Sequence, residues 1–222
     1  MFAGISTLRG SDEIVKVTPE QIRELQRCVL DPIYFIKNYV YINTKDKGMQ
    51  LFDLYDFQEE LIGKFNKYRF SAVRYPRQAG KSSTTRAYIL WYALFHRDKV
   101  VAMLANKLSL AQEQLQQLRD SYCELPYWMQ PGLKQWNKRA IQFSHGTRIM
   151  CAATSPDGIR GMSINCVDGD SMVTVKDIET NEIKKISICE LTNQLVNIGE
   201  YSDDIYYDGE TMLIKTDAEF EI

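Results

Sequence analysis

Hydrophobic positions recur at helical spacing in three segments of the first two-thirds of the chain. Thr18-Pro-Glu-Gln21 combines an N-cap hydroxyl, a proline at the first helical position and a glutamine three residues after the cap, which predicts a helix to about Leu30. The segment from Ser82 to Phe95 is apolar almost all round, which predicts a buried helix. The buried face of a third helix is predicted at Ala111, Leu115, Leu118 and Tyr122.

Short apolar runs between these segments predict strands. Phe70–Tyr75 and Val100–Ala105 are each expected to form a buried strand. Ile141–Ser144 and Thr147–Ala152 flank a His145-Gly146 turn and predict a pair of strands. Strands and helices therefore alternate as they do in nucleotide-binding α/β folds, and the predicted fold class is α/β. The aromatic stretch from residue 34 to 41 is expected to pack an N-terminal helical subdomain onto this core.

The pattern changes after residue 165, where only short β-prone segments follow. Met172–Val175 and Ile183–Ile188 are predicted strands separated by a polar turn. Ile205–Tyr207 and Thr211–Thr216 flank Asp208-Gly-Glu and predict a hairpin. A β-rich segment of this length buries too little apolar surface to close a core alone. We therefore predict a division into residues 1–165 and 166–222.

Charge supports the same boundary. Residues 166–222 carry four Lys and no Arg against fourteen Asp and Glu, a net charge of −10; the chain total of −2 leaves +8 for residues 1–165. A basic region suits a polyanion such as DNA, although solvated Lys and Arg give the same composition without any partner.

The chain has no pattern expected of a membrane or secreted protein. Its longest apolar run, Ala87–Phe95, is too short for a membrane span, and the N-terminus lacks a signal-peptide pattern, so a soluble cytosolic protein is expected. The five cysteines form no C-x-x-C pair, which argues against a zinc site or a disulfide framework. Four of them are expected to be small buried apolar side chains, and Cys166 is the exception.

A phosphate-binding loop is predicted at Tyr75-Pro-Arg-Gln-Ala-Gly-Lys-Ser82, between a predicted strand and a predicted helix. In that position backbone N–H groups and the helix dipole favour an anion. Gly80 allows close backbone approach, Lys81 neutralises the β- and γ-phosphates of ATP, and the Ser82 hydroxyl can ligate Mg²⁺. The general pattern has glycine where this chain has Tyr75. The residues predicted to bind ATP and Mg²⁺ in this loop are Gln78, Ala79, Gly80, Lys81, Ser82 and Ser83.

Several uncommon motifs occur together across residues 15–165. In this order they resemble the large terminase subunit of tailed bacteriophages, the ATP-driven motor and nuclease that packages DNA. The resemblance implies a P-loop ATPase with a parallel-sheet core and an N-terminal helical subdomain. The motifs are Asp31–Tyr39, Tyr55–Gln58, Arg77–Ser82, Leu104–Lys107, Leu125-Pro126, Gln130–Gly132, Trp136–Lys138 and Thr154–Gly161.

The resemblance also implies roles and partners. Gln58 matches the adenine-recognising motif, in which an amide both donates to and accepts from the base edge. Arg77 matches a cis-acting arginine that stabilises charge on the transferring γ-phosphoryl group. The implied partners are double-stranded DNA, the portal and the small terminase subunit, without a membrane, in the cytoplasm of an infected host cell.

A hydrolysing P-loop enzyme also needs a strand that ends in acidic residues. No apolar run ending in Asp-Glu follows the loop, and the resemblance places that strand directly after the Ile-Arg-Gly-x-Ser segment, at Cys166. By itself the chain is expected to bind ATP weakly and to hydrolyse it poorly or not at all.

Cys166-Val-Asp-Gly-Asp-Ser-Met-Val173 resembles the first motif of inteins, which have a β-rich Hint-type fold. The resemblance implies that the Cys166 thiol attacks the carbonyl of Asn165 and converts the amide to a thioester. The Thr-x-x-His and terminal His-Asn motifs of inteins do not follow Cys166. We therefore expect the N-terminal fragment of a split intein, completed by a basic C-terminal fragment that carries the rest of the terminase.

Two alternatives remain open from the sequence. In the first, residues 166–222 are an ordinary β extension, and the chain is a terminase fragment that binds only ATP or DNA. In the second, the reading frame is truncated and the intein is contiguous in the genome.

Overall fold

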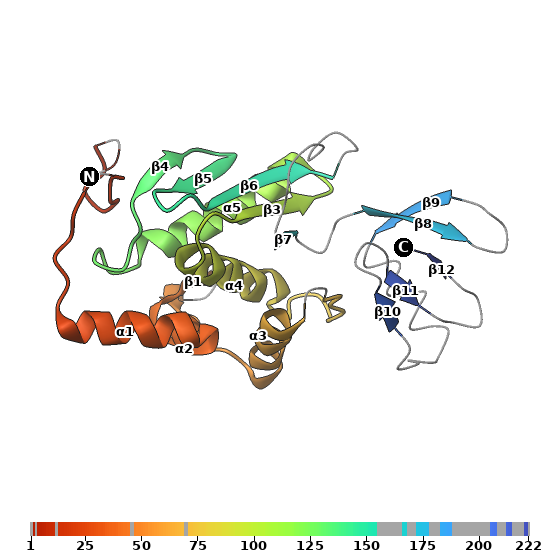
Figure 1. The fold of residues 1–222 in the computed structure, drawn as a ribbon, viewed down its shortest axis with the longest axis horizontal. Helices are drawn as coiled ribbons and strands as arrows, with labels where there is room; N and C mark the ends of the chain where they lie inside the picture. The colour runs from red at the N-terminus through yellow and green to blue at the C-terminus, as the bar shows by residue number, and fades with distance from the viewer. Residues whose placement is uncertain are drawn as a thin grey trace. The chain divides into compact units, whose positions relative to one another are not determined.

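The computed structural model describes residues 2, 4–11, 13–44, 47–68 and 71–154, together with the backbone of short strands beyond residue 165. The chain divides into two compact units (Figure 1). The first consists of Met1–Ser71 and Tyr75–Asp168, and the second of Ala72–Arg74 and Gly169–Ile222.

Two capped helices begin the first unit. Helix α1 (Pro19–Leu30) has the predicted capping box, in which the Thr18 hydroxyl accepts from Gln21 N and the Gln21 side chain accepts from Thr18 N. Helix α2 (Pro32–Tyr39) follows directly, because Asp31 Oδ1 accepts from two N–H groups of its first turn. The aromatic stretch thus forms a helix, and its Phe35 ring is fully buried edge-on against Phe95. This packing confirms the predicted role of these aromatics.

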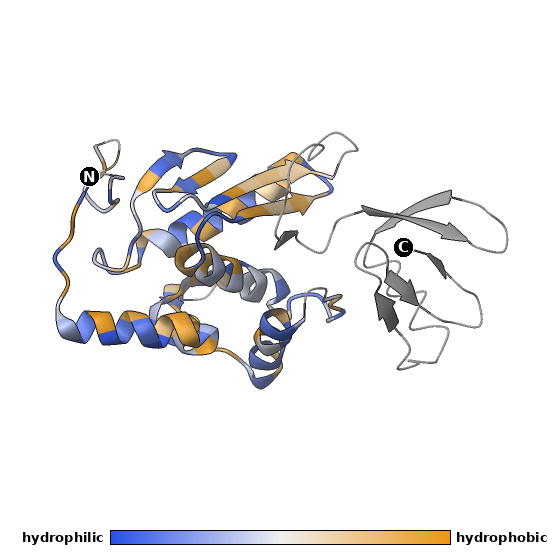
Figure 2. Cartoon of the chain, in the orientation of Figure 1, coloured by the Kyte–Doolittle hydropathy of each residue, from blue (hydrophilic) through white to orange (hydrophobic). Residues whose placement is uncertain are grey.

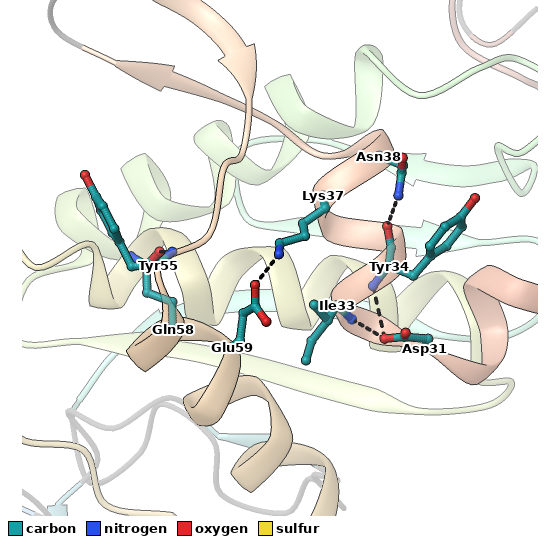
Figure 3. Close-up of polar contacts among 8 residues, drawn as sticks. All are labelled: Asp31, Ile33, Tyr34, Lys37, Asn38, Tyr55, Gln58 and Glu59. Atoms are coloured by element: carbon teal, nitrogen blue, oxygen red, sulfur yellow. Dashed lines mark hydrogen bonds and ion pairs between the residues drawn. The ribbon is translucent and has the colours of Figure 1, made fainter.

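A hairpin and a third helix lead to the predicted loop. Strands β1 (Tyr41–Thr44) and β2 (Gly48–Leu51) pair antiparallel, and α3 (Asp56–Lys67) follows. An ion pair between Lys37 of α2 and Glu59 of α3 joins the two helices (Figure 3).

The central layer is a mixed sheet with helices packed against it. Helix α4 (Lys81–Phe95) and helix α5 (Leu108–Cys123) contact each other, and α5 lies along β3 (Val100–Ala105) and β6 (Arg148–Ala153) (Figure 1). Figure 2 shows that β3 and β6 are mostly hydrophobic. The predicted helical stripe is confirmed, because all four of its residues are buried: Ala111, Leu115, Leu118 and Tyr122.

The sheet order is β4-β5-β6-β3-β7. Strand β3 is parallel to β6 and to β7 (Cys166–Val167), whereas β4 (Leu133–Trp136), β5 (Ala140–Phe143) and β6 pair antiparallel. The α/β class is therefore confirmed, but the sheet is mixed where a parallel core was expected. The predicted hairpin is also confirmed, with a turn at His145-Gly146.

The predicted buried strand at residues 70–75 is wrong for the residues described. Residues 71–76 form no strand, and Ser71, Ala72 and Arg74 are exposed. A central parallel strand takes its hydrogen bonds from neighbours on both sides, so an apolar run alone cannot form one. Residue 70 lies outside the described residues.

The second unit contains an antiparallel sheet of order β10-β11-β12-β8-β9. Strands β8 (Met172–Asp177) and β9 (Ile183–Ser187) lie where two strands are predicted, and they pair antiparallel. Strands β10 (Ile205–Tyr207) and β11 (Met212–Ile214) form the predicted hairpin, and β12 (Phe220–Glu221) joins β11 to β8. The β-rich character expected after residue 165 is thus confirmed, while the domain boundary itself stays a prediction.

Candidate nucleotide-binding loop

The predicted loop ends at a helix N-terminus that no side chain caps. Gly80 is the N-cap of α4 and has a left-handed backbone with φ 75°. Gln78 also has a positive φ of 65°, so the chain reverses sharply just before the helix. The first-turn N–H groups of a helix have no intrahelical partner and lie at the positive end of its dipole. This geometry is suited to an anion such as phosphate.

Lys81 contacts the loop that precedes it. Its Nζ donates to the carbonyl of Tyr75 at 2.6 Å and to that of Pro76 at 3.3 Å. The ammonium group therefore spans the loop between its first residues and the helix start. To contact a phosphate, Lys81 can donate its third N–H or exchange one of these carbonyls for a phosphate oxygen.

The serines after Lys81 differ in their surroundings. Ser82, the predicted Mg²⁺ ligand, is exposed, whereas the Ser83 hydroxyl accepts from Arg86 Nη2 at 3.0 Å. Arg86 also donates to Gln114 of α5, which fixes the first turn of α4 against its neighbour. Ser82 is thus the hydroxyl in this turn that faces solvent.

Thr84 is a loop-supporting residue that the sequence analysis missed. It is fully buried, and both its N–H and its hydroxyl donate to the Gly80 carbonyl, at 2.9 and 3.1 Å. A buried threonine four residues after a glycine N-cap is the signal that indicates this contact.

Gln58 reaches the loop from α3, although it lies more than twenty residues earlier. Its Oε1 accepts from Tyr55 N at 3.1 Å (Figure 3), and its Nε2 donates to the Ala79 carbonyl at 3.2 Å. The side chain is only 3% exposed. A Cβ on Gly80 would lie 2.5 Å from Gln58 Nε2, so the two residues are closely fitted. The structure therefore brings Gln58 together with the loop, while its predicted adenine contact stays a prediction.

Tyr75 also links the loop to α3, which gives a physical reason for its departure from the glycine pattern. Its hydroxyl donates to the Phe57 carbonyl at 3.4 Å, and its ring lies 5.4 Å from the Phe57 ring. The Phe57 ring in turn stacks on Tyr55. Arg77 lies exposed in the same loop, and its predicted role on the γ-phosphoryl group stays a prediction.

The predicted splice junction is only partly described. Asn165 lies outside the described residues, and Cys166 begins β7, whose backbone pairs with β3. The register places Cys166 opposite Val101 and Val167 opposite Ala102.

Comparison with protein-family models matches residues 74–189 to the family described as terminase large subunit, T4likevirus-type, N-terminal. The chain belongs to this family. The match begins just before the loop at Arg74, and it continues through the predicted junction to Cys189. The terminase family supports a role in phage DNA packaging, with DNA, portal and small subunit as the implied packaging partners. In the part of the terminase that the structure describes, every helix is too short or too polar to cross a membrane.

Proposed function

We propose that this terminase chain binds ATP with Mg²⁺ at the loop before α4 and contributes the first part of the packaging-motor ATPase. The observation that carries the proposal is the uncapped N-terminus of α4 at Gly80, next to Lys81. Phosphate oxygens would accept from the first-turn N–H groups and from Lys81 Nζ, while the exposed Ser82 hydroxyl would ligate Mg²⁺. Arg77 and Gln58 are assigned to the γ-phosphoryl group and to the adenine side of the site.

Titration of the full chain with a fluorescent ATP analogue in Mg²⁺ tests this proposal. Lys81→Ala is expected to weaken binding by about tenfold or more, because it removes a charge-assisted contact with phosphate. Lys64→Ala on α3 is the matched control, since Lys64 is exposed and pairs with Glu60. Equal affinity of the Lys81→Ala variant and the unmodified chain would overturn the assignment.

For residues 166–222 we propose the N-terminal part of a split intein. The Cys166 sulfur would attack the Asn165 carbonyl carbon, the C–N bond would break, and the thiol proton would pass to the freed amine. The side-chain nucleophile that begins the partner's terminase segment would then take the acyl group and release the Cys166 thiol. Cyclisation of the Asn that ends the partner's intein segment would break its bond to that residue, and the freed amine would take the acyl group from the side chain. The net result is one peptide bond between Asn165 and the rest of the terminase, with the intein segments released.

The pairing register of β7 with β3 supports the proposal that residues joined by splicing would extend this sheet. Among the described residues, β7 pairs with Val101 and Ala102 of β3, whereas β6 pairs along all of Val100–Ala105. Residues that replace Cys166 after splicing would therefore continue beside Met103–Ala105, and the fifth of them would reach the end of β3. Ligands of open α/β sheets bind at this carboxyl edge. Two acidic residues at about that position would supply the missing carboxylates, one to ligate Mg²⁺ and one to activate the attacking water.

Mass spectrometry after mixing with the candidate C-terminal partner tests splicing. The expected product contains residues 1–165 joined to the partner and lacks residues 166–222, and Cys166→Ala should abolish it. The other described cysteines are suitable controls, because burial raises the pKa of Cys28 to about 12 and raises the pKa of Cys151. Cys151→Ala should therefore leave the product yield unchanged. Splicing of the Cys166→Ala variant would overturn this mechanism.

One observation favours the alternative, in which residues 166–222 are a non-splicing extension. The family match spans residues 74–189, a range that includes Asn165 and Cys166 and ends at Cys189. Under this alternative the chain remains intact after mixing with every partner, and its activity is limited to binding ATP or DNA.

A further inference from the structure

A cavity of about 670 Å³ lies at the turn between β4 and β5, and its lining is basic. Lys138 and Arg139 of this turn and Arg148 of β6 contribute cations, while Gln112, Gln135 and Asn137 contribute amides. The described lining contains no carboxylate. None of these residues belongs to the nucleotide-binding loop, so the cavity is a separate site.

The turn is held by Asn137, which leaves its two cations exposed. Asn137 Oδ1 accepts from the N–H groups of Arg139 at 2.8 Å and Ala140 at 2.9 Å, and Asn137 N donates to the Ala140 carbonyl. The side chains of Lys138 and Arg139 are therefore not needed to form the turn, and both residues are exposed.

Arg148 contributes a third cation from the adjacent strand. The registers place Arg148 opposite Gln142 and Gln142 opposite Gln135, so the three residues form one row across the sheet. The neighbouring row contains Trp136, Ile141 and Ile149, of which Ile141 and Ile149 are fully buried. Because successive side chains of a strand alternate between faces, the polar row lies on the opposite face. Arg148 Nε is buried and has no hydrogen-bond partner among the described residues.

We propose that this cavity binds the phosphate backbone of duplex DNA. Three cations in a described lining that has no carboxylate favour an anion. The amide N–H groups of the lining add hydrogen bonds that phosphate oxygens can accept. Residues 125–156 contain four basic residues and no Asp or Glu, so the surrounding chain is also basic. The features that suit a nucleotide, a positive-φ glycine and an uncapped helix N-terminus, lie at Gly80 and α4 and not at this cavity. The inference rests on the proposed packaging function and names the surface that would contact DNA.

Fluorescence anisotropy of the full chain with a labelled duplex tests the proposal over a range of salt concentrations. Lys138→Ala with Arg139→Ala is expected to weaken binding about tenfold or more and to reduce the slope of log affinity against log salt by about two. Lys16→Ala with Lys47→Ala is the charge-matched control, because both residues are exposed and lie outside the cavity. Lys138→Arg with Arg139→Lys should keep most of the affinity, since backbone phosphates require charge more than shape.

The outcomes separate this inference from the proposed function. An equal loss of DNA affinity in the cavity and control variants, or no loss in either, would overturn the assignment of the cavity as the DNA site. The proposals of ATP binding and splicing would be unaffected by that result. Absence of duplex binding by the unmodified chain would overturn the inference as well. Competition by free phosphate at millimolar concentration, with ATP binding at the loop unchanged, would show a small-anion site and not a DNA site. Arg148→Gln, checked for its melting temperature, extends the test to the third cation and is expected to weaken duplex binding further.

Discussion

The two sides of the proposed nucleotide-binding loop differ sharply, although the sequence predicts regular structure on both. After the loop, α4 is a helix of fifteen residues with eight of them buried. Before the loop, residues 71–76 form no strand, and several of them are exposed. A helix makes its hydrogen bonds within its own segment, whereas a strand needs partners from elsewhere. The comparison shows that α4 is formed and packed although residues 71–76 contribute no strand beside it.

The largest effect is expected from completing the sheet. In the product of the proposed splicing, amides of residues 71–75 should become protected from hydrogen exchange by about a thousandfold or more, because a central strand opens only with the whole domain. Amides of α4 should be protected both before and after splicing. Protection of residues 71–75 in the unspliced Cys166→Ala chain would show that the strand needs no added partner.

Removal of packing on the helical side is expected to cost the most stability among point substitutions. Leu90 of α4 is fully buried, so Leu90→Ala should reduce the free energy of unfolding by about 2–5 kcal/mol in denaturant titrations. Leu110→Ala is the matched control, since Leu110 is 43% exposed and should change stability by less than about 1 kcal/mol. Similar losses for the two variants would contradict a self-sufficient packed helix.

A smaller loss of stability is expected at Gly80, where the loop meets α4. Gly80→Ala places a side chain in the left-handed region and within 2.5 Å of Gln58 Nε2, which should cost about 1–2 kcal/mol and weaken ATP binding. Gly63→Ala in α3 meets no atom within 4 Å and should be neutral or stabilising by up to about 1 kcal/mol. Adding Gln58→Ala to Gly80→Ala should recover part of the loss. No recovery would indicate that the backbone, and not the contact with Gln58, limits this position.

The smallest loss of stability is expected at Tyr75, on the side of the loop that forms no strand. Tyr75→Phe removes one long hydrogen bond to the Phe57 carbonyl but keeps the ring contact, so the cost should be about 0.5 kcal/mol. Hydrogen exchange of residues 77–80 should quicken in this variant. Tyr68→Phe, at an exposed position, is the control. A loss above about 2 kcal/mol would mean that Tyr75 anchors the loop more strongly than its geometry indicates.

The sequence predicted those features that depend on neighbouring residues. The capping box at Thr18, the helix after Gly80 and the hairpin at His145-Gly146 were predicted from local patterns, and all are present. The strand predicted at residues 70–75 is absent from residues 71–75, because a strand needs distant partners that a local pattern does not specify. The contact from Gln58 to Ala79 joins residues 21 positions apart, and no local pattern specifies such a distance.

The hydrogen bonds from Lys81 Nζ to the Tyr75 and Pro76 carbonyls have a consequence for which anions the proposed site would select. Under the proposed function, an incoming anion competes with these two backbone oxygens for the N–H groups of Lys81. A weakly charged solute would compete poorly, whereas a triphosphate would offer several charged oxygens to the same ammonium group.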